Sequence, residues 1–200
     1  MAELLNALGR RFSCRQYTGE PVADAELNLV LEAGRIAPSA FGMEPWRFIV
    51  VRSPAVKEKV AAACFDQPAA AGVPLMIAIV ALAGVLEPGS AYVEARLTAE
   101  AGGQPPPREL REAYRGMHAQ IDPRGWAIAQ CSFAAAQMMV QAASMGLATC
   151  PMGGFDEAAL ARALGLAGGE IPALMLALGH CGEARGERRR RGMDEIVTGI

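Results

Sequence analysis

Apolar residues recur along the chain with two different spacings, and each spacing predicts one type of element. A stripe at positions 27, 30, 31 and 34 follows the i, i+3, i+4, i+7 rule, which is typical of an amphipathic helix. Further apolar spacings and capping residues predict helices over about 4–9, 54–64, 108–118 and 156–165. Continuous apolar runs of strand length lie at 48–51, 75–80, 147–150 and 173–178. Since the run at 75–80 is apolar on both faces, we expect a central strand there.

The longest predicted helix, 126–145, is apolar on almost every side. A helix of that kind is buried all round, so we expect it to form the core of a homodimer. Gly146 is its expected C-terminal cap. The preceding region, about 84–125, is the least regular, because its glycines and prolines at 102–107 suit neither a helix interior nor a central strand.

These elements together predict one domain over residues 1–200 of the α+β class, with a mixed, mostly antiparallel sheet between layers of helices. The chain length suits one such domain or one compact subunit. We expect residues from about 84 to 125 to form an excursion or lid, and residues from about 180 to 200 to form an arginine-rich C-terminal extension.

Composition and charge narrow the possible partners. Hydrophobic residues make up 52% of the chain and charged residues 20%, which supports a sizeable core and excludes global disorder. The net charge of −2 provides no general attraction for nucleic acid or for an anionic membrane. The longest apolar run, 73–86, is shorter than the about 18 residues that a membrane-spanning helix needs. We therefore expect a cytoplasmic protein whose partner is neither nucleic acid nor a membrane.

The cysteines and the missing motifs limit the possible chemistry. The cysteines are odd in number, lie far apart and show no CxxC spacing, so we expect free thiols in a reducing compartment. They are Cys14, Cys64, Cys131, Cys150 and Cys181. The sequence also contains no GxGxxG after a strand, no GxxxxGKS/T, no HExxH and no GxSxG. We therefore expect no metal site and assign no catalytic side chain.

One loop, residues 38–46, combines a stiff backbone with small and aromatic side chains. Its prolines restrict the backbone, its glycine allows dihedrals that other residues avoid, and its small residues bring main chain close to a ligand. These residues are Pro38, Ser39, Ala40, Phe41, Gly42, Pro45 and Trp46. The combination suits a planar ligand, but composition alone favours the alternative of a simple connector with Trp46 in the core.

Two glycines and two groups of arginines are candidates for binding an anion. Arg11, Ser13 and Arg15 alternate, so an extended segment would point all three the same way and form a phosphate site. The alternative is a solvated basic turn, and for these residues alone it is favoured. The run 188–191 is either a solvated tail or a nucleic-acid contact. Gly153 and Gly154 offer bare backbone amides, or only a turn.

Taken together and in this order, the pieces resemble one family, the FMN-dependent nitroreductases, over nearly the whole chain. Residues 11–15, RFSCR, are similar to the N-terminal RxSxR motif of that family. Residues 37–46, APSAFGMEPW, resemble its APSS-x-N-x-QPW loop, and residues 126–155 resemble its long dimer helix with the following P-x-x-G-F-D turn. Residues 189–191, RRR, resemble its C-terminal K/R-x-R motif.

The resemblance implies a nitroreductase-like three-layer α-β-α sandwich with a long central dimer helix. It also implies that the terminal motifs hold the FMN phosphate, that the loop 37–46 reaches the flavin of the partner subunit, and that the turn lies beside the reactive edge of the flavin. The implied cofactor-binding residues are Arg11, Phe12, Ser13, Arg15, Pro38, Ser39, Ala40, Gly42, Gln67, Pro151, Met152, Gly153, Gly154, Arg189 and Arg191. We expect Phe41 and Tyr114 to line the substrate pocket, and Arg188 and Arg190 to face solvent by alternation.

The implied activity is ping-pong: NAD(P)H delivers a hydride to flavin N5, and an electron acceptor such as a nitroaromatic or a quinone then takes its place. Gly42 and Glu44 depart from the family pattern, in which many members have Asn and Gln. Gly153 replaces an acidic residue of some members, and Ala70 falls where some carry a flavin-contacting Lys. Two alternatives stay open: an enone or dehalogenating flavin reductase on the same scaffold, and a non-catalytic module that binds nucleic acid or a partner through the arginine tail.

Overall fold

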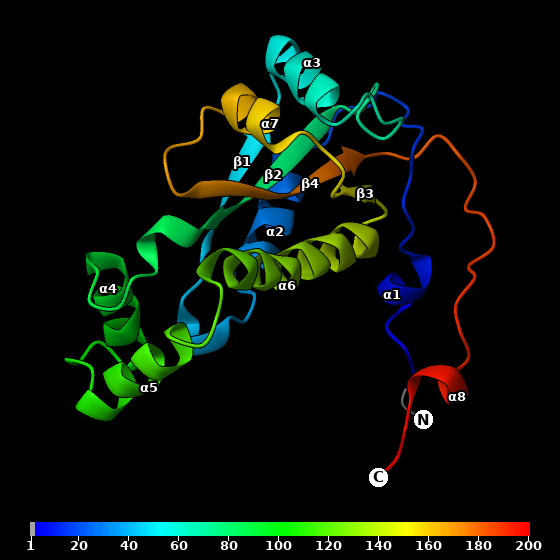
Figure 1. Cartoon of the computed structure of the whole chain (residues 1–200). Coiled ribbons are helices and arrows are strands. Elements are labelled where there is room, and N and C mark those ends of the chain that lie inside the picture. Colours follow the sequence, from blue (N-terminus) through cyan, green and yellow to red (C-terminus); the bar gives the residue numbers. More distant parts are fainter. Residues whose placement is uncertain (1–2) are drawn as a thin grey trace.

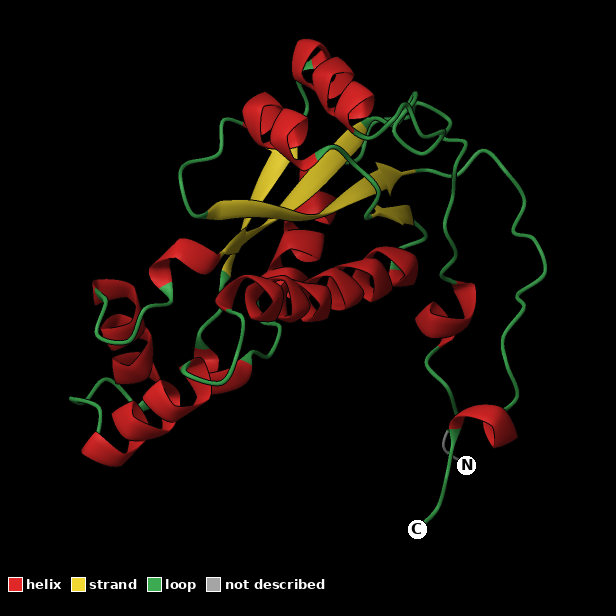
Figure 2. Cartoon of the chain, in the orientation of Figure 1, coloured by secondary structure: helices red, strands yellow, loops and turns green. Residues whose placement is uncertain are grey.

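The computed structural model describes residues 3–200, in which helices and strands follow one another irregularly (Figure 1, Figure 2). Along these residues the order is α1 (Asn6–Arg10), α2 (Asp24–Arg35), η1 (Ala40–Gly42), β1 (Trp46–Val51), α3 (Pro54–Ala63), β2 (Leu75–Leu82), η2 (Ala83–Val85), α4 (Ala91–Glu100), α5 (Arg108–His118), α6 (Pro123–Ser144), β3 (Ala148–Met152), α7 (Glu157–Leu164), β4 (Glu170–Gly179) and α8 (Met193–Ile196). Here η marks a short 3-10 turn. Helices together with one β-sheet confirm the predicted α+β class.

The strands of the described residues form one sheet in the order β1-β2-β4-β3, and each neighbouring pair is antiparallel. The sheet is therefore not mixed, since parallel pairing within residues 3–200 is limited to an isolated bridge between Ser13 and Thr149. The strands predicted at 75–80 and 173–178 are the central ones, as expected from runs of apolar residues. Pro172 lies in β4 beside a register irregularity at Ile79 and Val80, which accommodates a residue without an N–H.

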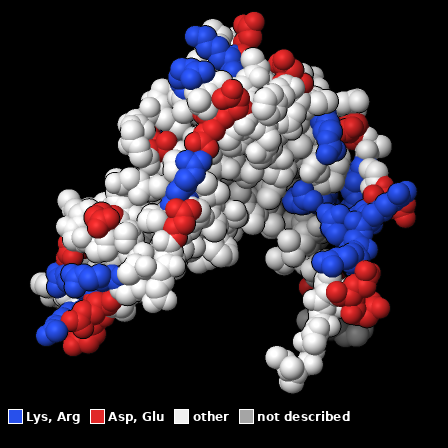
Figure 3. Space-filling view, in the orientation of Figure 1, with Lys and Arg blue, Asp and Glu red and all other residues white. Residues whose placement is uncertain are grey.

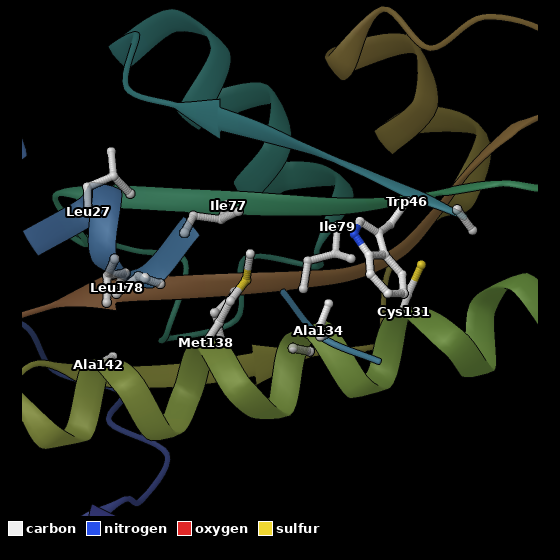
Figure 4. Packing of buried hydrophobic residues seen from close by; sticks show 14 of the residues in the cluster. Leu27, Trp46, Ile77, Ile79, Cys131, Ala134, Met138, Ala142 and Leu178 are labelled. Atoms are coloured by element: carbon white, nitrogen blue, oxygen red, sulfur yellow. The ribbon is translucent and has the colours of Figure 1, made fainter. Parts of the chain in front are cut away.

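Helices cover both faces of the sheet, which makes the three layers of the predicted sandwich (Figure 1). Ile77 and Ile79 of β2 belong to the core between the sheet and the helices α2 and α6 (Figure 4). Met76 and Ala78 belong to the core on the other face, with α3 and α7. Because successive side chains of a strand point to opposite faces, one apolar strand contributes to both cores.

The helix α6 runs along the lower face of the sheet in Figure 4 and is the longest of the described helices. It begins at Pro123, where the side chain of Asp122 accepts hydrogen bonds from the first free N–H groups, and it ends before Gly146, which has a φ of 84°. Gly34 lets α2 approach closely, since an added Cβ would lie 2.2 Å from the Cε of Met138. On the opposite side Phe133 is 51% exposed, so this chain alone does not bury α6 on all sides.

The predicted excursion folds into two helices that project from the main body (Figure 1). α5 begins and ends as predicted, whereas α4 was not predicted. A third core joins these helices, and its buried residues are Met43, Val93, Leu97 and Tyr114. The loop before β1 is thereby packed against the excursion through Met43.

The predicted C-terminal extension leaves β4 and runs past α1 as an arm that carries α8 (Figure 1). The prediction of five free thiols is wrong, because Cys14 and Cys181 form a disulfide. Their spacing of 167 residues hides this pair, which is brought together by the pairing of Tyr17 with Cys181. The cytoplasmic location, which rested partly on free thiols, stays a prediction. Among residues 3–200, no helix is both long and apolar enough to cross a membrane.

Candidate functional site

The N-terminal motif is an extended segment beside β3. The backbone N–H of Cys14 donates to the carbonyl of Thr149 at 3.2 Å, and Ser13 forms the isolated bridge to the same strand. Cys14 is fully buried, whereas Arg11, Ser13 and Arg15 all line one cavity. The predicted alternation of this segment is therefore present in the structure.

The C-terminal arm is fastened to this segment by its first residues. Besides the disulfide, the N–H of Gly182 donates to the carbonyl of Gln16 at 2.7 Å, and the N–H of Thr18 donates to that of His180 at 3.0 Å. The N–H of Arg15 donates to the carboxylate of Glu183 at 2.5 Å. The two ends of the chain thus meet side by side.

Between the two ends lies a cavity of about 310 Å³, which we call the arginine cavity. It is lined by Arg11, Phe12, Ser13, Arg15, Glu183, Ala184, Arg185, Gly186, Glu187, Arg188, Arg189 and Arg190. Arginines from both chain ends therefore face one space, and only two carboxylates accompany them. Figure 3 shows the resulting concentration of basic side chains over the arm.

The predicted alternation of the C-terminal arginines is wrong. Arg188 donates to the carbonyls of Leu8 at 3.0 Å and of Gly9 at 3.2 Å, and also to that of Arg11. Arg190 lines the arginine cavity together with Arg189, whereas Arg191 does not. Residues 183–190 are irregular rather than a strand, so their side chains do not alternate between two faces.

Charge repulsion in the arginine cavity shows in the acidity of one side chain. Burial lowers the pKa of the Arg11 guanidinium below its usual range, and the nearby cations of Arg188 and Arg190 lower it further. Like charges have been brought together here without enough carboxylates to balance them. A bound anion with several oxygens would supply the missing charge and accept the free N–H groups.

The predicted glycine turn lies just beyond β3. Pro151 and Met152 belong to the strand itself, and Met152 is buried in the core, while Gly153 and Gly154 are exposed. The side-chain amide of Gln67 donates to the carbonyl of Gly154 at 2.6 Å and to that of Cys64 at 3.0 Å. Gln67 therefore holds the turn in place and keeps its own oxygen available as an acceptor.

The predicted planar-ligand loop has an unusual backbone. Phe41, Gly42 and Glu44 have φ angles of 57°, 56° and 42°. The side-chain oxygen of Ser39 accepts a hydrogen bond from the N–H of Glu44 at 2.8 Å. The N–H of Ala40 donates to the side-chain oxygen of Gln130, a buried polar residue of α6, at 3.0 Å. Pro38 is exposed at the start of this loop.

The two predicted pocket-lining aromatics differ in exposure. Tyr114 is only 1% exposed and donates its hydroxyl to the carbonyl of Leu86 at 2.6 Å. Its ring meets that of Phe41 edge-on, with the ring centroids 5.6 Å apart. Tyr114 is therefore a core residue that supports Phe41, which corrects its expected place on a pocket wall. Trp46 lies in β1 and is also buried, so the alternative that placed it in the core is confirmed.

The structure brings the predicted site residues together in two places. The N-terminal motif, the glycine turn and Arg189 gather around β3 and the arm, whereas the loop 38–45 lies beside α4 and α5 on the other side of the molecule (Figure 1). Sequence reasoning missed Arg185 and Glu183 in the first place, and Gln130, Tyr92 and Arg96 in the second. Of these, Gln130 had a signal, as a polar residue within an otherwise apolar helix face.

Comparison with known proteins agrees with this fold and these motifs. The model of the Nitroreductase family matches residues 8–180. A Thermus thermophilus protein named "NADH dehydrogenase" is 31% identical over 194 residues, which covers 96% of this chain and 92% of that protein. A Staphylococcus haemolyticus protein named "Putative NAD(P)H nitroreductase" is 26% identical and covers 98% of this chain and 97% of its own length.

Solved structures show the same fold. A Bacillus subtilis structure titled as a "putative nitroreductase" superimposes with a TM-score of 0.83 at 22% identity, covering 98% of this chain and 97% of that one. An Exiguobacterium sibiricum structure, titled as a "putative nitroreductase in complex with FMN", has a TM-score of 0.81 at 24% identity and covers 100% of this chain and 98% of that one. On the family match and the full-length relative, this chain is an enzyme of the nitroreductase family.

Proposed function

We propose that this enzyme binds FMN and passes a hydride from NAD(P)H, through the flavin, to a small-molecule electron acceptor such as a nitroaromatic or a quinone. The observation that carries the proposal is the arginine cavity, where guanidiniums from both chain ends face one space. The names of the relatives agree with this chemistry, since one is titled with FMN and another with NAD(P)H.

The residues of the arginine cavity fit the phosphate of FMN. Arg11, Arg15 and Arg189 offer guanidiniums and Ser13 offers a hydroxyl, all toward the same space. A phosphate dianion would relieve the repulsion that lowers the pKa of Arg11. Charge-assisted hydrogen bonds of this kind contribute about 1.5–3 kcal/mol each. Phe12 lines the same cavity and would lie against the chain that follows the phosphate.

The glycine turn would hold the flavin edge, because Gly153 and Gly154 expose their backbone without side chains. Gln67 fixes that turn through its bond to Gly154. Ala70, which is buried, provides no cation for a negatively charged flavin. When bound, FMN supplies the redox step by accepting a hydride at N5 and passing it on in ping-pong order. The protein contributes binding and orientation, and no side chain is assigned as a general base.

The site requires a second copy of the chain, and we propose a homodimer. The loop 38–45, which the family resemblance places at the flavin of the partner subunit, lies far from the arginine cavity of its own chain (Figure 1). An apolar groove beside α6 is open in the single chain, and it includes Leu5, Leu8, Ile36 and Val140. Figure 3 shows a hollow with mostly uncharged walls between the excursion and the arm, into which a second copy would fit.

The proposed function is tested by the absorbance spectrum of the purified protein and by titration with FMN. We expect a flavin spectrum that NADH or NADPH bleaches and that a nitroaromatic or quinone restores, with parallel lines in double-reciprocal plots. Intersecting lines would contradict the ping-pong order. A screen of enones and halogenated phenols distinguishes the alternative reductases. A colourless protein that does not bind FMN but binds DNA or RNA in a steeply salt-dependent manner would favour the non-catalytic alternative.

A further inference from the structure

The loop 38–45 holds a backbone shape that it cannot maintain alone. Phe41 and Glu44 have positive φ angles, although only glycine adopts that region without steric cost. Residues held in such conformations persist only where the surrounding structure fixes them, and they are concentrated at binding and active sites. The contacts that fix this loop therefore bear on its function.

Two side chains of α4 bind three successive carbonyls of the loop. The hydroxyl of Tyr92 lies 2.8 Å from the carbonyl oxygens of both Met43 and Glu44. The Nε of Arg96 donates to the carbonyl of Gly42 at 2.7 Å. Because residues 92 and 96 are one helical turn apart, they lie on the same face of α4. This face therefore holds the loop by its backbone.

Arg96 also matches the charge of the loop. Its Nη2 lies 2.5 Å from the carboxylate of Glu44, the residue that stands where many family members have Gln. Glu100, one turn further along α4, fills the space beside Gly42, since an added Cβ there would lie 2.5 Å from its carboxylate oxygen. Both departures from the family pattern in this loop thus face α4.

We infer that Arg96 is a positioning residue for the flavin-binding loop. By holding the carbonyl of Gly42 and the carboxylate of Glu44, it keeps the backbone of residues 39–41 and the ring of Phe41 in the shape that meets the flavin and the acceptor. The excursion is then a clamp on this loop rather than a lid. The inference rests on the proposed function, in which this loop contacts FMN.

The test compares Arg96→Ala with Arg111→Ala. Arg111 is a matched control, because it also pairs with a carboxylate, Glu94, and donates to a carbonyl, that of Pro106, but entirely within the excursion. We expect Arg96→Ala to raise the FMN dissociation constant and the acceptor KM by about tenfold, with kcat changing less. Arg96→Lys should recover part of the loss, because it keeps the charge but not both bonds. Arg111→Ala should change neither constant.

A second measurement does not depend on flavin. Amide hydrogen exchange of residues 39–44, in the full chain without added FMN, should be about tenfold faster in Arg96→Ala than in the unmutated protein. The Arg111→Ala protein should exchange as the unmutated one does. Equal effects of the two substitutions, or none from Arg96→Ala, would overturn the inference. If the unmutated protein does not bind FMN, the proposed function fails, while exchange still decides whether Arg96 clamps the loop.

Discussion

The disulfide between Cys14 and Cys181 should be a major source of stability. It joins residues 167 positions apart, so it restricts nearly the whole unfolded chain. The chain-entropy relation predicts about 5 kcal/mol for a loop of this size, and measured values are usually about 2–4 kcal/mol. Taking about 3 kcal/mol, loss of the bond through Cys181→Ser or a dithiol should lower the Tm by about 6–12 °C for a chain of this length.

Loss of the disulfide should affect FMN binding less than it affects stability. The arm remains attached through the bonds from Gly182 to Gln16, from Thr18 to His180 and from Arg15 to Glu183. Each such bond contributes about 1 kcal/mol, so the arm should stay in place in the folded protein. We expect the FMN dissociation constant to rise by less than about tenfold.

The assay is thermal unfolding without FMN, with and without dithiol, for the unmutated protein and for Cys181→Ser. Dithiol should lower the Tm of the unmutated protein only, and the variant should already have the lower value. Thiol titration after denaturation without reductant should find the three thiols of Cys64, Cys131 and Cys150. Five reactive thiols, or an unchanged Tm after the bond is opened, would refute the reasoning.

Three further predictions concern the cofactor site, the dimer and the pH dependence of stability. Arg11→Ala should weaken FMN binding about ten- to a hundredfold, while Arg191→Ala, outside the arginine cavity, should leave it unchanged in a fluorescence titration. Ala136→Glu places a charge in the apolar groove beside α6, so sedimentation and absorbance should show loss of the flavin-containing dimer or insoluble protein; a yellow dimer would contradict this. The guanidinium of Arg47 lowers the pKa of Glu170 below its model value of 4.5. The pair therefore stabilises the fold above that pH, and this contribution should disappear as pH falls through the lowered pKa. Urea unfolding of Glu170→Gln should show a loss of about 1 kcal/mol or less at neutral pH, since solvent screens the pair, and none in acid.

Local sequence determined the main elements because their apolar residues are dense and regularly spaced. The runs at 75–80 and 173–178 became the central strands, and the predicted helix 126–145 became α6 with Gly146 at its end. The helix α4 was missed because it buries only Val93 and Leu97, so its apolar pattern is weak. Its stability comes from packing against Met43 and Tyr114, which are distant in sequence.

The sequence also located the segments that form the site, since motif order and residue type are local properties. Only the tertiary structure decided which side chains meet. It joined Cys14 to Cys181, turned Arg188 toward the N-terminal carbonyls and buried Tyr114 beneath Phe41. The physical reason is that side-chain direction follows from regular spacing only within a helix or strand. In irregular segments such as 183–190, it depends on contacts with residues far away in the chain.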